Sequence, residues 1–483
     1  MRSMISVAPS PKRPPHNGLA AALLISFDEL MAGALEHVGP RWKHHRDLKE
    51  ARDKAGNNAR QAHPPNLPVF RVNTPVSSGP AVSLLFVTGR VFVPFALGYF
   101  LSYMFRTVNA VLGPVLGEEL GIDAAAIGLL TGAYFFAFAT VQIPLGMALD
   151  KFGPRRTQAV LLTVAATGAL LFSLGGDTLS LALARAVIGA GVSGCLLASF
   201  KIFALWLPSQ KLPLVNGLLM ACGGLGVMAS STPVQIAVET IGWRYLFHII
   251  AAVTLLVAVL IFFVVPDRRA QGEPKTLNDQ LRGLSFIFRS RIFWAVTPLV
   301  MTAQAAWMST QALWFGPWLR DMGGLDADRA AEALFIGGIG MVAGYALLGW
   351  LTERLSRRGI SVNLIAGIAT ATFIAMQILL ATGAPLPAWV MTSAFAFTGG
   401  SATIFYSGLT QKFPVAMAGR VNTSIALFTF SLAGLLQLIM GAVLDFFPAE
   451  GGGYRPTGYF VAFGGWALVQ IACFTWFLLR GTR

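Results

Sequence analysis

The sequence predicts an all-α membrane protein with twelve transmembrane helices, arranged as two related six-helix halves. Three observations lead to this prediction: a low charge density, twelve apolar segments of spanning length, and landmarks that occur twice. Of the 483 residues, 55% are hydrophobic and 12% are charged, and the mean hydropathy is +0.64. Because soluble domains carry about 25% charged residues, this chain cannot cover a water-facing surface of its length. A cytosolic enzyme is therefore excluded.

Residues 1–85 form a basic tail that we expect to be disordered. The segment is rich in Pro, Lys and Arg, and it holds five of the six histidines of the chain. Its apolar stretch at residues 19–24 is far shorter than a membrane crossing, which takes about 20 residues. A signal-peptide pattern with a small-residue cleavage site is missing. The alternative that an upstream start adds non-native sequence stays open.

Twelve apolar runs follow the tail, and Gly, Pro and charged residues separate them at spacings typical of transmembrane helices. They predict an N-terminal bundle in residues 86–266, a cytoplasmic linker in residues 267–292 and a C-terminal bundle in residues 293–483. Within the linker, residues 277–287 are expected to lie along the membrane surface as a helix. The predicted helices lie at about 91–116, 127–149, 156–175, 179–206, 213–238, 245–265, 293–319, 331–352, 361–383, 387–410, 421–445 and 456–479.

The distribution of positive charge predicts that both termini lie in the cytoplasm. An even number of crossings places both termini on one side, and Lys and Arg concentrate in cytoplasmic loops. After the tail, one set of loops holds 17 Lys and Arg residues, whereas the other holds only Arg244, Arg320, Arg329 and Arg455. We therefore expect a multi-pass protein of the cytoplasmic (inner) membrane. The formal net charge of +14 reflects this bias and the tail rather than a nucleic-acid site.

Landmarks recur in the two halves at nearly one spacing. A Gly-Pro pair that begins at Gly113 is matched 203 positions later at Gly316, and the loop that begins at Gly146 is matched 203 positions later at Gly349. Parallel repeats related by an axis along the membrane normal place a solute site at their interface, near the bilayer midplane. The duplication therefore predicts a carrier in which one half rocks against the other, by alternating access.

The loop that begins at Gly146 reads Gly-Met-Ala-Leu-Asp-Lys-Phe-Gly-Pro-Arg-Arg and resembles the most specific signature of the major facilitator superfamily. The second copy resembles it less, with Glu353 for the Asp and Ser356 for the later Gly. Arg185 and Gly189 in the fourth helix resemble a further signature. The resemblance covers the chain after the tail and implies a twelve-helix secondary carrier, which we expect to be a monomer. The fifth helix departs from the signature of many drug exporters, which disfavours drug efflux.

The signature loop is expected to form a latch between the halves. Asp150 ends the second predicted helix, where it can meet the start of the eleventh, whose backbone N–H groups and dipole favour an anion. This latch would close when the transporter opens outward, with Glu353 and the start of the fifth helix as a weaker second pair. The alternative is an ordinary basic loop. The expected latch residues are Gly146, Asp150, Lys151, Gly153, Arg155, Arg156, Glu353, Arg354 and Arg420.

Arg106 lies deep in the first predicted helix, about ten residues from its nearer end, where its head group does not easily reach water. A charge near the midplane costs at least about 2.5 kcal/mol on insertion scales, so it should face a wet cavity or a partner. The alternative is a structural arginine bonded to helix-end carbonyls. We expect it to line the transport pathway, because polar residues recur with it at helical steps in one stripe of Tyr99, Ser102, Tyr103, Arg106, Asn109 and Gly113.

The seventh helix, the repeat partner of the first, carries amides and aromatic rings at similar steps. Aromatic rings and amides suit a polar solute, although a Trp stripe is also common in packing. Arg185 and Gly189 are expected to tie the fourth helix to the core. The expected substrate contacts are Tyr103, Arg106, Asn109, Tyr134, Gln311 and Trp314.

After the tail, every Asp and Glu lies at a predicted helix end or in a loop. Buried positive charge without buried negative charge predicts an anionic solute that neutralises Arg106 on binding. The first helix also resembles those of organic-anion and organophosphate permeases, because Tyr103, Arg106 and Pro114 match the pattern around their phosphate-binding arginine. The seventh helix departs from that pattern, with Met308 and Ser309 where those permeases place a second arginine.

The sequence therefore predicts a secondary carrier that moves a small organic anion across the bilayer. No ATP-binding loop, metal-ligand cluster or nucleophile triad is visible in it, so we expect no enzyme activity, no metal, no bound cofactor and no nucleic-acid partner. Two alternatives stay open. One is a carrier of a neutral or zwitterionic solute (a sugar, drug or dipeptide) in which Arg106 is structural. The other is a membrane receptor or scaffold that does not transport.

Overall fold

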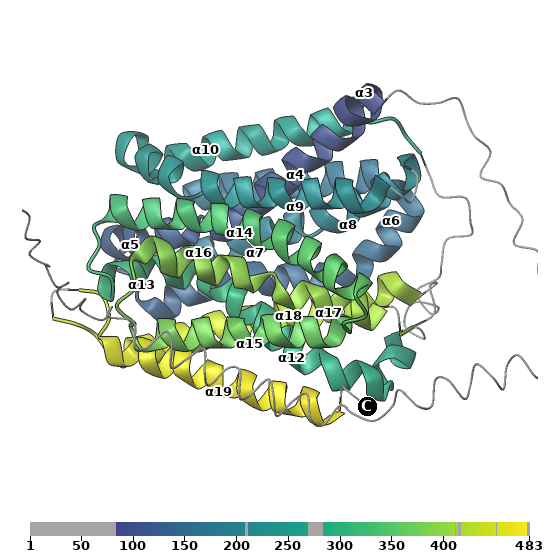
Figure 1. The fold of residues 1–483 in the computed structure, drawn as a ribbon. Coiled ribbons are helices and arrows are strands. Elements are labelled where there is room, and N and C mark those ends of the chain that lie inside the picture. Colours follow the sequence, from purple (N-terminus) through teal and green to yellow (C-terminus); the bar gives the residue numbers. More distant parts are fainter. Residues whose placement is uncertain are drawn as a thin grey trace, which may run out of the picture. The chain divides into compact units, whose positions relative to one another are not determined.

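The computed structural model describes residues 84–207, 211–268, 284–410, 412–413, 417–450 and 452–480. Residues 1–83 of the expected tail and most of the expected linker helix lie outside these ranges. Within them the chain is helical, apart from its loops and an isolated β-bridge between Pro448 and Tyr454. Figure 1 shows long helices that run side by side in roughly one direction, as membrane-spanning segments do.

The first half of the molecule runs from α3 to α10. Asp123 and Asp177 start two of its helices, because their carboxylates accept hydrogen bonds from first-turn N–H groups. The elements are α3 (Leu84–Val87), the π-helical turn η1 (Thr88–Phe92), α4 (Val93–Thr107), α5 (Asn109–Leu120), α6 (Ala124–Leu174), α7 (Thr178–Val192), α8 (Cys195–Trp206), α9 (Leu212–Ala229) and α10 (Thr232–Val264).

The second half runs from α12 to α19. A π-helical turn interrupts its first crossing, and such a turn inserts an extra residue into the helix and rotates the face that follows. The elements are α12 (Arg291–Ser309), η3 (Thr310–Trp314), α13 (Phe315–Asp321), α14 (Ala327–Arg357), α15 (Val362–Ala381), α16 (Ala388–Gly399), α17 (Ser401–Thr410), α18 (Ala418–Asp445) and α19 (Pro456–Arg480).

These elements make twelve crossings, as the sequence predicts. Seven described helical segments are long and apolar enough to span a membrane, and the pair α4 and α5, bent by 41°, makes an eighth. Two of the seven are 51 residues long, about 75 Å at 1.5 Å per residue, so each holds two crossings of a hydrocarbon core about 30 Å thick. They turn back at Gly153 (φ 80°, ψ 162°) and Gly242 (φ 78°, ψ 154°), in a backbone region essentially limited to glycine. The broken segments α12 to α13 and α16 to α17 complete the twelve.

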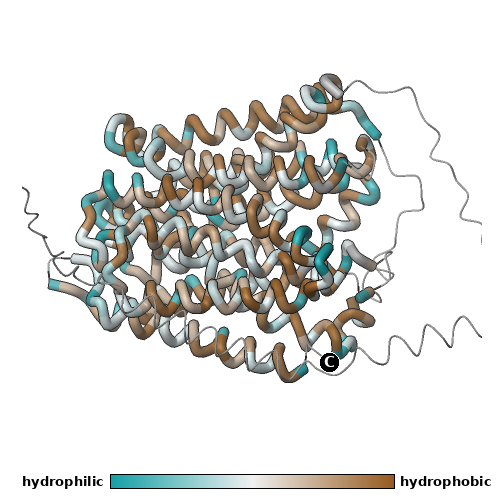
Figure 2. The backbone as a smooth tube through the Cα atoms, in the orientation of Figure 1, coloured by the Kyte–Doolittle hydropathy of each residue, from teal (hydrophilic) through white to brown (hydrophobic). Residues whose placement is uncertain are grey.

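The outer surface of the bundle is apolar. Large hydrophobic side chains on outer helices are exposed, among them Leu256 and Phe263 on α10 and Leu468 on α19. Figure 2 shows this apolar character along α10. Such a surface is stable in lipid and not in water, so the chain is a multi-pass integral membrane protein.

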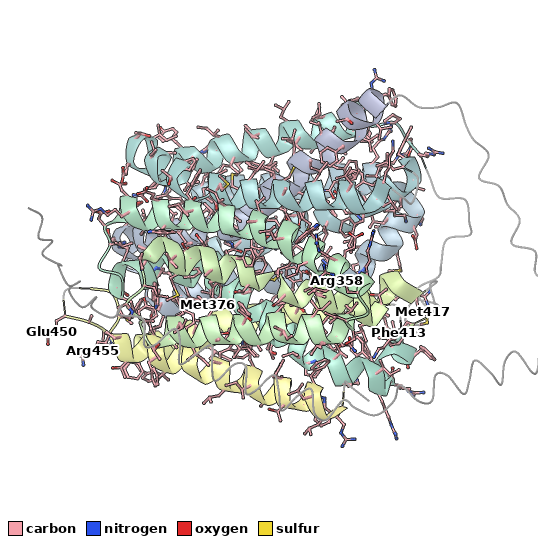
Figure 3. The ribbon with its side chains drawn as sticks, in the orientation of Figure 1. Arg358, Met376, Phe413, Met417, Glu450 and Arg455 are labelled. Carbon is pink, nitrogen blue, oxygen red and sulfur yellow. The ribbon has the colours of Figure 1, made fainter. Side chains whose placement is uncertain are left out.

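The two ends of the helices differ in charge. The end that we name the basic end carries the turn at Gly153 with Arg155 and Arg156, and both α3 and the last turn of α19 lie there, on the right of Figure 1. The end that we name the acidic end carries the starts of α6 and α14 and the end of α18. Figure 3 shows Glu450 and Arg455 at the acidic end, on the left.

Candidate functional site

A cavity of about 610 Å³ lies between the two halves, and both halves line it. Helices α4, α6, α7, α8 and α9 contribute from the first half, and α12, α14, α17 and α18 contribute from the second. The described lining residues are Tyr99, Ser102, Tyr103, Arg106, Phe138, Gln142, Val192, Ser193, Leu196, Leu197, Phe200, Met220, Gln304, Met308, Tyr345, Thr403, Thr410, Asn422, Ala426 and Phe430.

Close helix contacts close this cavity toward the acidic end. A Cβ added at Gly128 of α6 would lie 2.6 Å from the backbone oxygen of Gln437 on α18. A Cβ at Gly316 of α13 would collide with the backbone oxygen of Ala110 on α5, and a Cβ at Gly224 of α9 would collide with the Val342 side chain of α14. Because these contacts join opposite halves, the backbones meet there with little space between them.

The cavity opens toward the basic end. Cβ atoms added at Gly217 of α9, Gly349 of α14 and Gly419 of α18 would meet no heavy atom within 4 Å outside their own helices. The cavity lining continues in this direction as far as Thr410 and Asn422, whose side chains share a hydrogen bond of 2.8 Å. The cavity around Arg106 therefore extends toward the basic end, and the close helix contacts separate it from a further pocket at the acidic end.

Arg106 forms the inner limit of the cavity, two residues before the bend at Val108. Its side chain is surrounded by aromatic rings, and its Cζ atom lies 4.4 Å from the ring centroid of Tyr103, 5.6 Å from that of Phe138 and 5.3 Å from that of Phe430. Rings stabilise a cation through their π faces but do not neutralise it. Arg106 is the only ionised side chain among the described residues that line the cavity.

Two of the rings around Arg106 also join the halves. Phe138 of α6 and Phe430 of α18 stack with centroids 3.9 Å apart and planes inclined by 22°. They lie between the cavity and the closed contacts toward the acidic end. The guanidinium is therefore held at the level where the halves separate, and Arg106 as a whole is 5% exposed.

Amide and hydroxyl groups make up the polar part of the lining. The Gln142 side chain donates to the carbonyl oxygen of Ser193 at 3.3 Å, which fixes α6 against the start of α8. The Oε1 atom of Gln304 is buried without a hydrogen-bond partner in the described residues. A buried acceptor without a donor is costly, so this oxygen is suited to a donor group on a bound solute.

Of the six predicted substrate contacts, Tyr103 and Arg106 line the cavity and the other four lie elsewhere. The Asn109 amide donates to the Thr131 hydroxyl at 2.8 Å, and Tyr134 is fully buried behind the lining, where its hydroxyl donates to the carbonyl oxygen of Ser102 at 3.4 Å. Gln311 lines a separate small cavity, and Trp314 lines a pocket at the acidic end.

Two helix irregularities explain the separation of Asn109, Gln311 and Trp314 from the cavity. The bend at Val108 turns Asn109 away from the face that carries Arg106, and the π-helical turn η3 rotates Gln311 and Trp314 relative to Gln304. Helical spacing predicts a common face only where the helix is regular.

Sequence reasoning did not predict several lining residues as substrate contacts. Gln142 and Asn422 are polar residues inside apolar spans, and that signal was available in the sequence. Phe138 and Phe430 carry no such signal, because a phenylalanine in an apolar helix fits lipid, core and cavity equally well.

Arg185 is a second buried arginine, but it is bonded to the protein itself. Its Nη1 atom donates to the carbonyl oxygen of Phe105 at 2.8 Å, and its Cζ atom lies 4.9 Å from the Tyr134 ring. A Cβ at Gly189 would collide with the backbone oxygen of Tyr134, so glycine permits α7 to pack there. Arg185 and Gly189 thus join α7 to α4 and α6, next to Arg106.

The residues of the signature loop pair with the first half and with Asp267, which follows α10. Asp150 forms an ion pair with Lys201 of α8 at 2.5 Å. Arg155 donates to the Val265 carbonyl oxygen at 3.1 Å, and Arg156 lies 3.5 Å from Asp267. Gly146 is half-buried in the same segment, before the turn at Gly153, and the Lys151 ammonium lies 5.2 Å from the Phe152 ring.

The corresponding residues of the second half also pair locally. Glu353 forms an ion pair with Arg357 at 2.6 Å, and the Arg354 Cζ atom lies 5.1 Å from the Trp350 ring. Arg420 is half-buried in the first turn of α18, and its carbonyl oxygen accepts a hydrogen bond from Ser424. In this conformation the Asp150 ion pair is with Lys201 and not with the start of α18. In the described ranges, no three His, Cys, Asp or Glu side chains come together as a metal site.

Twelve crossings in two halves around a cavity open at one end are the architecture of a polytopic membrane transporter. The Major Facilitator Superfamily matches residues 95–436, and the chain belongs to this family. The resemblance found in the sequence is thereby confirmed. The family and the relatives named below are transporters and not enzymes.

Several named proteins are similar to the chain. "Probable sulfoacetate transporter SauU" of Cupriavidus necator is 26% identical over 286 residues, which are 56% of this chain and 66% of the relative. The chain thus spans slightly less than two thirds of that protein's length. "D-galactonate transporter" of Escherichia coli O6:H1 is 23% identical over 79% of this chain and 93% of the relative. The crystal structure of the nucleoside transporter NupG has a TM-score of 0.63 at 15% identity, covering 80% of this chain and 99% of that one, which supports the fold.

Proposed function

We propose that the protein is a secondary carrier of a small organic anion, and that the anion binds to Arg106. The observation that carries this proposal is an ionised arginine in a cavity whose other described lining residues are uncharged. Two similar proteins are named as transporters of sulfoacetate and D-galactonate, and both solutes are organic anions. Their names support the same substrate class for this chain.

Arg106 would recognise the acid group of the solute. A guanidinium presents a planar fork of N–H donors that matches a carboxylate or sulfonate, and a hydrogen bond to a charged group contributes about 1.5–3 kcal/mol. The three rings keep the cation in place without using up its charge. Gln304 and the hydroxyl groups of the lining would bind polar groups elsewhere on the solute. The cavity volume suits a small solute.

The contrast between the two buried arginines favours a binding role for Arg106 over a structural one. Arg185 donates to a backbone carbonyl and lies away from the cavity, which is the arrangement of an arginine that ties helices together. Arg106 lines the cavity and is surrounded by ring faces.

Transport would proceed by rocking of the bundles formed by residues 86–266 and 293–483, within a single chain acting as a monomer. By the positive-inside rule, we place the basic end and both termini in the cytoplasm, and the protein in the cytoplasmic (inner) membrane. The described conformation is then inward-facing. In the outward-facing state Asp150 would leave Lys201 and bind the start of α18 near Arg420.

Uptake into proteoliposomes tests this proposal. Labelled sulfoacetate and D-galactonate are supplied to vesicles that contain the wild type, Arg106→Gln or Arg90→Gln. Arg90 is exposed on η1, so its substitution removes the same charge outside the cavity. We expect Arg106→Gln to lose uptake at least about tenfold while Arg90→Gln keeps it. Equal uptake by both variants would contradict the anion site at Arg106.

A further inference from the structure

The acidic end contains a contact between the halves that the sequence did not indicate. The carboxylate of Asp445, the last residue of α18, accepts hydrogen bonds from the backbone N–H groups of Ala124 (3.0 Å) and Ala125 (2.8 Å). These are the first two residues of α6. One carboxylate of the second half thus binds the first half through both of its oxygens.

The electrostatics of the start of α6 favour this contact. The first N–H groups of a helix lack partners within the helix, and the helix dipole places positive charge there. Asp123, from the same half, accepts a hydrogen bond from Ala126 at 2.8 Å. The N–H groups of Ala124 and Ala125 are instead satisfied by Asp445. If the halves separated at this end, the two N–H donors and the Asp445 carboxylate would lose these hydrogen bonds.

The local packing brings the two helix ends into contact. A Cβ at Gly441, one turn before Asp445, would lie 2.5 Å from the carbonyl oxygen of Ala124. The absence of a side chain at Gly441 thus lets α18 approach the start of α6. An ion pair between Arg320 and Glu118 at 3.0 Å also joins the halves at this end, but both side chains are exposed and such pairs contribute little.

We propose that Asp445 is the positioning residue that holds the cavity closed at the acidic end, and that α6 and α18 carry reciprocal latches. At the acidic end Asp445 ends α18 and caps the start of α6. At the basic end Asp150 ends the first crossing of α6 and would cap the start of α18. Each latch is formed when the other is broken. Here Asp445 bridges the halves while Asp150 pairs with Lys201. The reciprocal part of this proposal rests on the proposed transport by alternating access.

The distance between the halves at the acidic end tests the role of Asp445 without any transport assay. Spin labels are attached to cysteines at the exposed positions Gly176 and Pro385, in a background in which the three native cysteines are replaced by Ala, and the distance distribution is measured by pulsed EPR. Asp445→Asn puts a side-chain NH₂ group in place of one accepting oxygen. We expect the ratio of long to short distances between the labels to be at least about tenfold higher in Asp445→Asn than in the same protein with Asp445 intact.

Asp123→Asn is the matched control. It removes the same charge at the same helix start, but its hydrogen bond lies within the first half, and Asn caps helices about as well as Asp. We expect it to leave the distances unchanged. If Asp445→Asn does not fold, Asp445→Ser carries the same prediction, because its shorter side chain fits and places one uncharged oxygen where the carboxylate binds with two charged ones. Unchanged distances in the Asp445 variant, or an equal change in Asp123→Asn, would overturn the proposal. Failure of anion uptake alone would overturn the proposed function instead.

Discussion

Gly242 offers a test of how the long helices are folded into separate crossings. It turns α10 back with φ 78° and ψ 154°, and a Cβ there would meet no heavy atom within 4 Å. Gly242→Ala therefore adds backbone strain without a steric clash, at a cost of about 1–3 kcal/mol. Gly217 on α9 also has open space around it but lies within a helix, so Gly217→Ala is the matched control. That substitution should stabilise the helix by roughly 0.5–1 kcal/mol.

Thermal unfolding of the purified protein in detergent measures both changes. For units of about 150–250 residues, 1 kcal/mol moves Tm by about 2–4 °C. Gly242→Ala should therefore lower Tm by about 2–12 °C, whereas Gly217→Ala should raise it by about 1–4 °C. Shifts of the same sign and size in both variants would refute the assignment of the turn to a backbone conformation that requires glycine.

Arg185→Met should lower Tm by several degrees but keep anion binding. It removes a charge-assisted hydrogen bond to Phe105 and the stacking on Tyr134, which together contribute about 2–5 kcal/mol. Loss of anion binding at an unchanged Tm would instead indicate that Arg185 contacts the substrate. Met308→Arg should place a second cation in the cavity and raise the binding preference for dianions over monoanions about tenfold. An unchanged ratio of the dissociation constants for dianions and monoanions would show that position 308 does not contact the solute. Burial raises the pKa of the Asp321 carboxyl. The folded state therefore keeps the carboxyl proton at a pH where the unfolded state has lost it. As a result, stability falls as the pH rises from about 4 through the raised pKa. Asp321→Asn should flatten that part of the profile of Tm against pH. Parallel profiles for the wild type and the variant would contradict the raised pKa of Asp321.

Much of the fold follows from local sequence features. The number of crossings follows from the length and spacing of apolar runs, and the turn at Gly153 follows from a glycine between two such runs. Arg106 and Tyr103 are found because an ionised residue deep in an apolar helix requires a partner or a cavity. In each case a feature within one segment carries a free-energy cost that only a few structures can offset.

The rest of the site depends on features that span elements. The bend at Val108 and the π-helical turn at Thr310–Trp314 rotate faces that regular spacing treats as continuous. The stacking of Phe138 on Phe430 requires the relative placement of α6 and α18, which no pattern within either helix specifies. Under the proposed alternating access, the partner of Asp150 would depend on which end of the carrier is open, and one sequence would encode both states.

A binding cycle between acid and arginine tests the central claim most directly. D-Galactonate and its uncharged amide are titrated by calorimetry into the wild type and into Arg106→Gln, with sulfoacetate as a second acid. If Arg106 binds the acid group, the wild type binds the acid at least about tenfold more tightly than the amide, and the variant loses this difference, a coupling of about 1.4 kcal/mol or more. An acid preference of the same size in Arg106→Gln would show that another part of the protein recognises the negative charge.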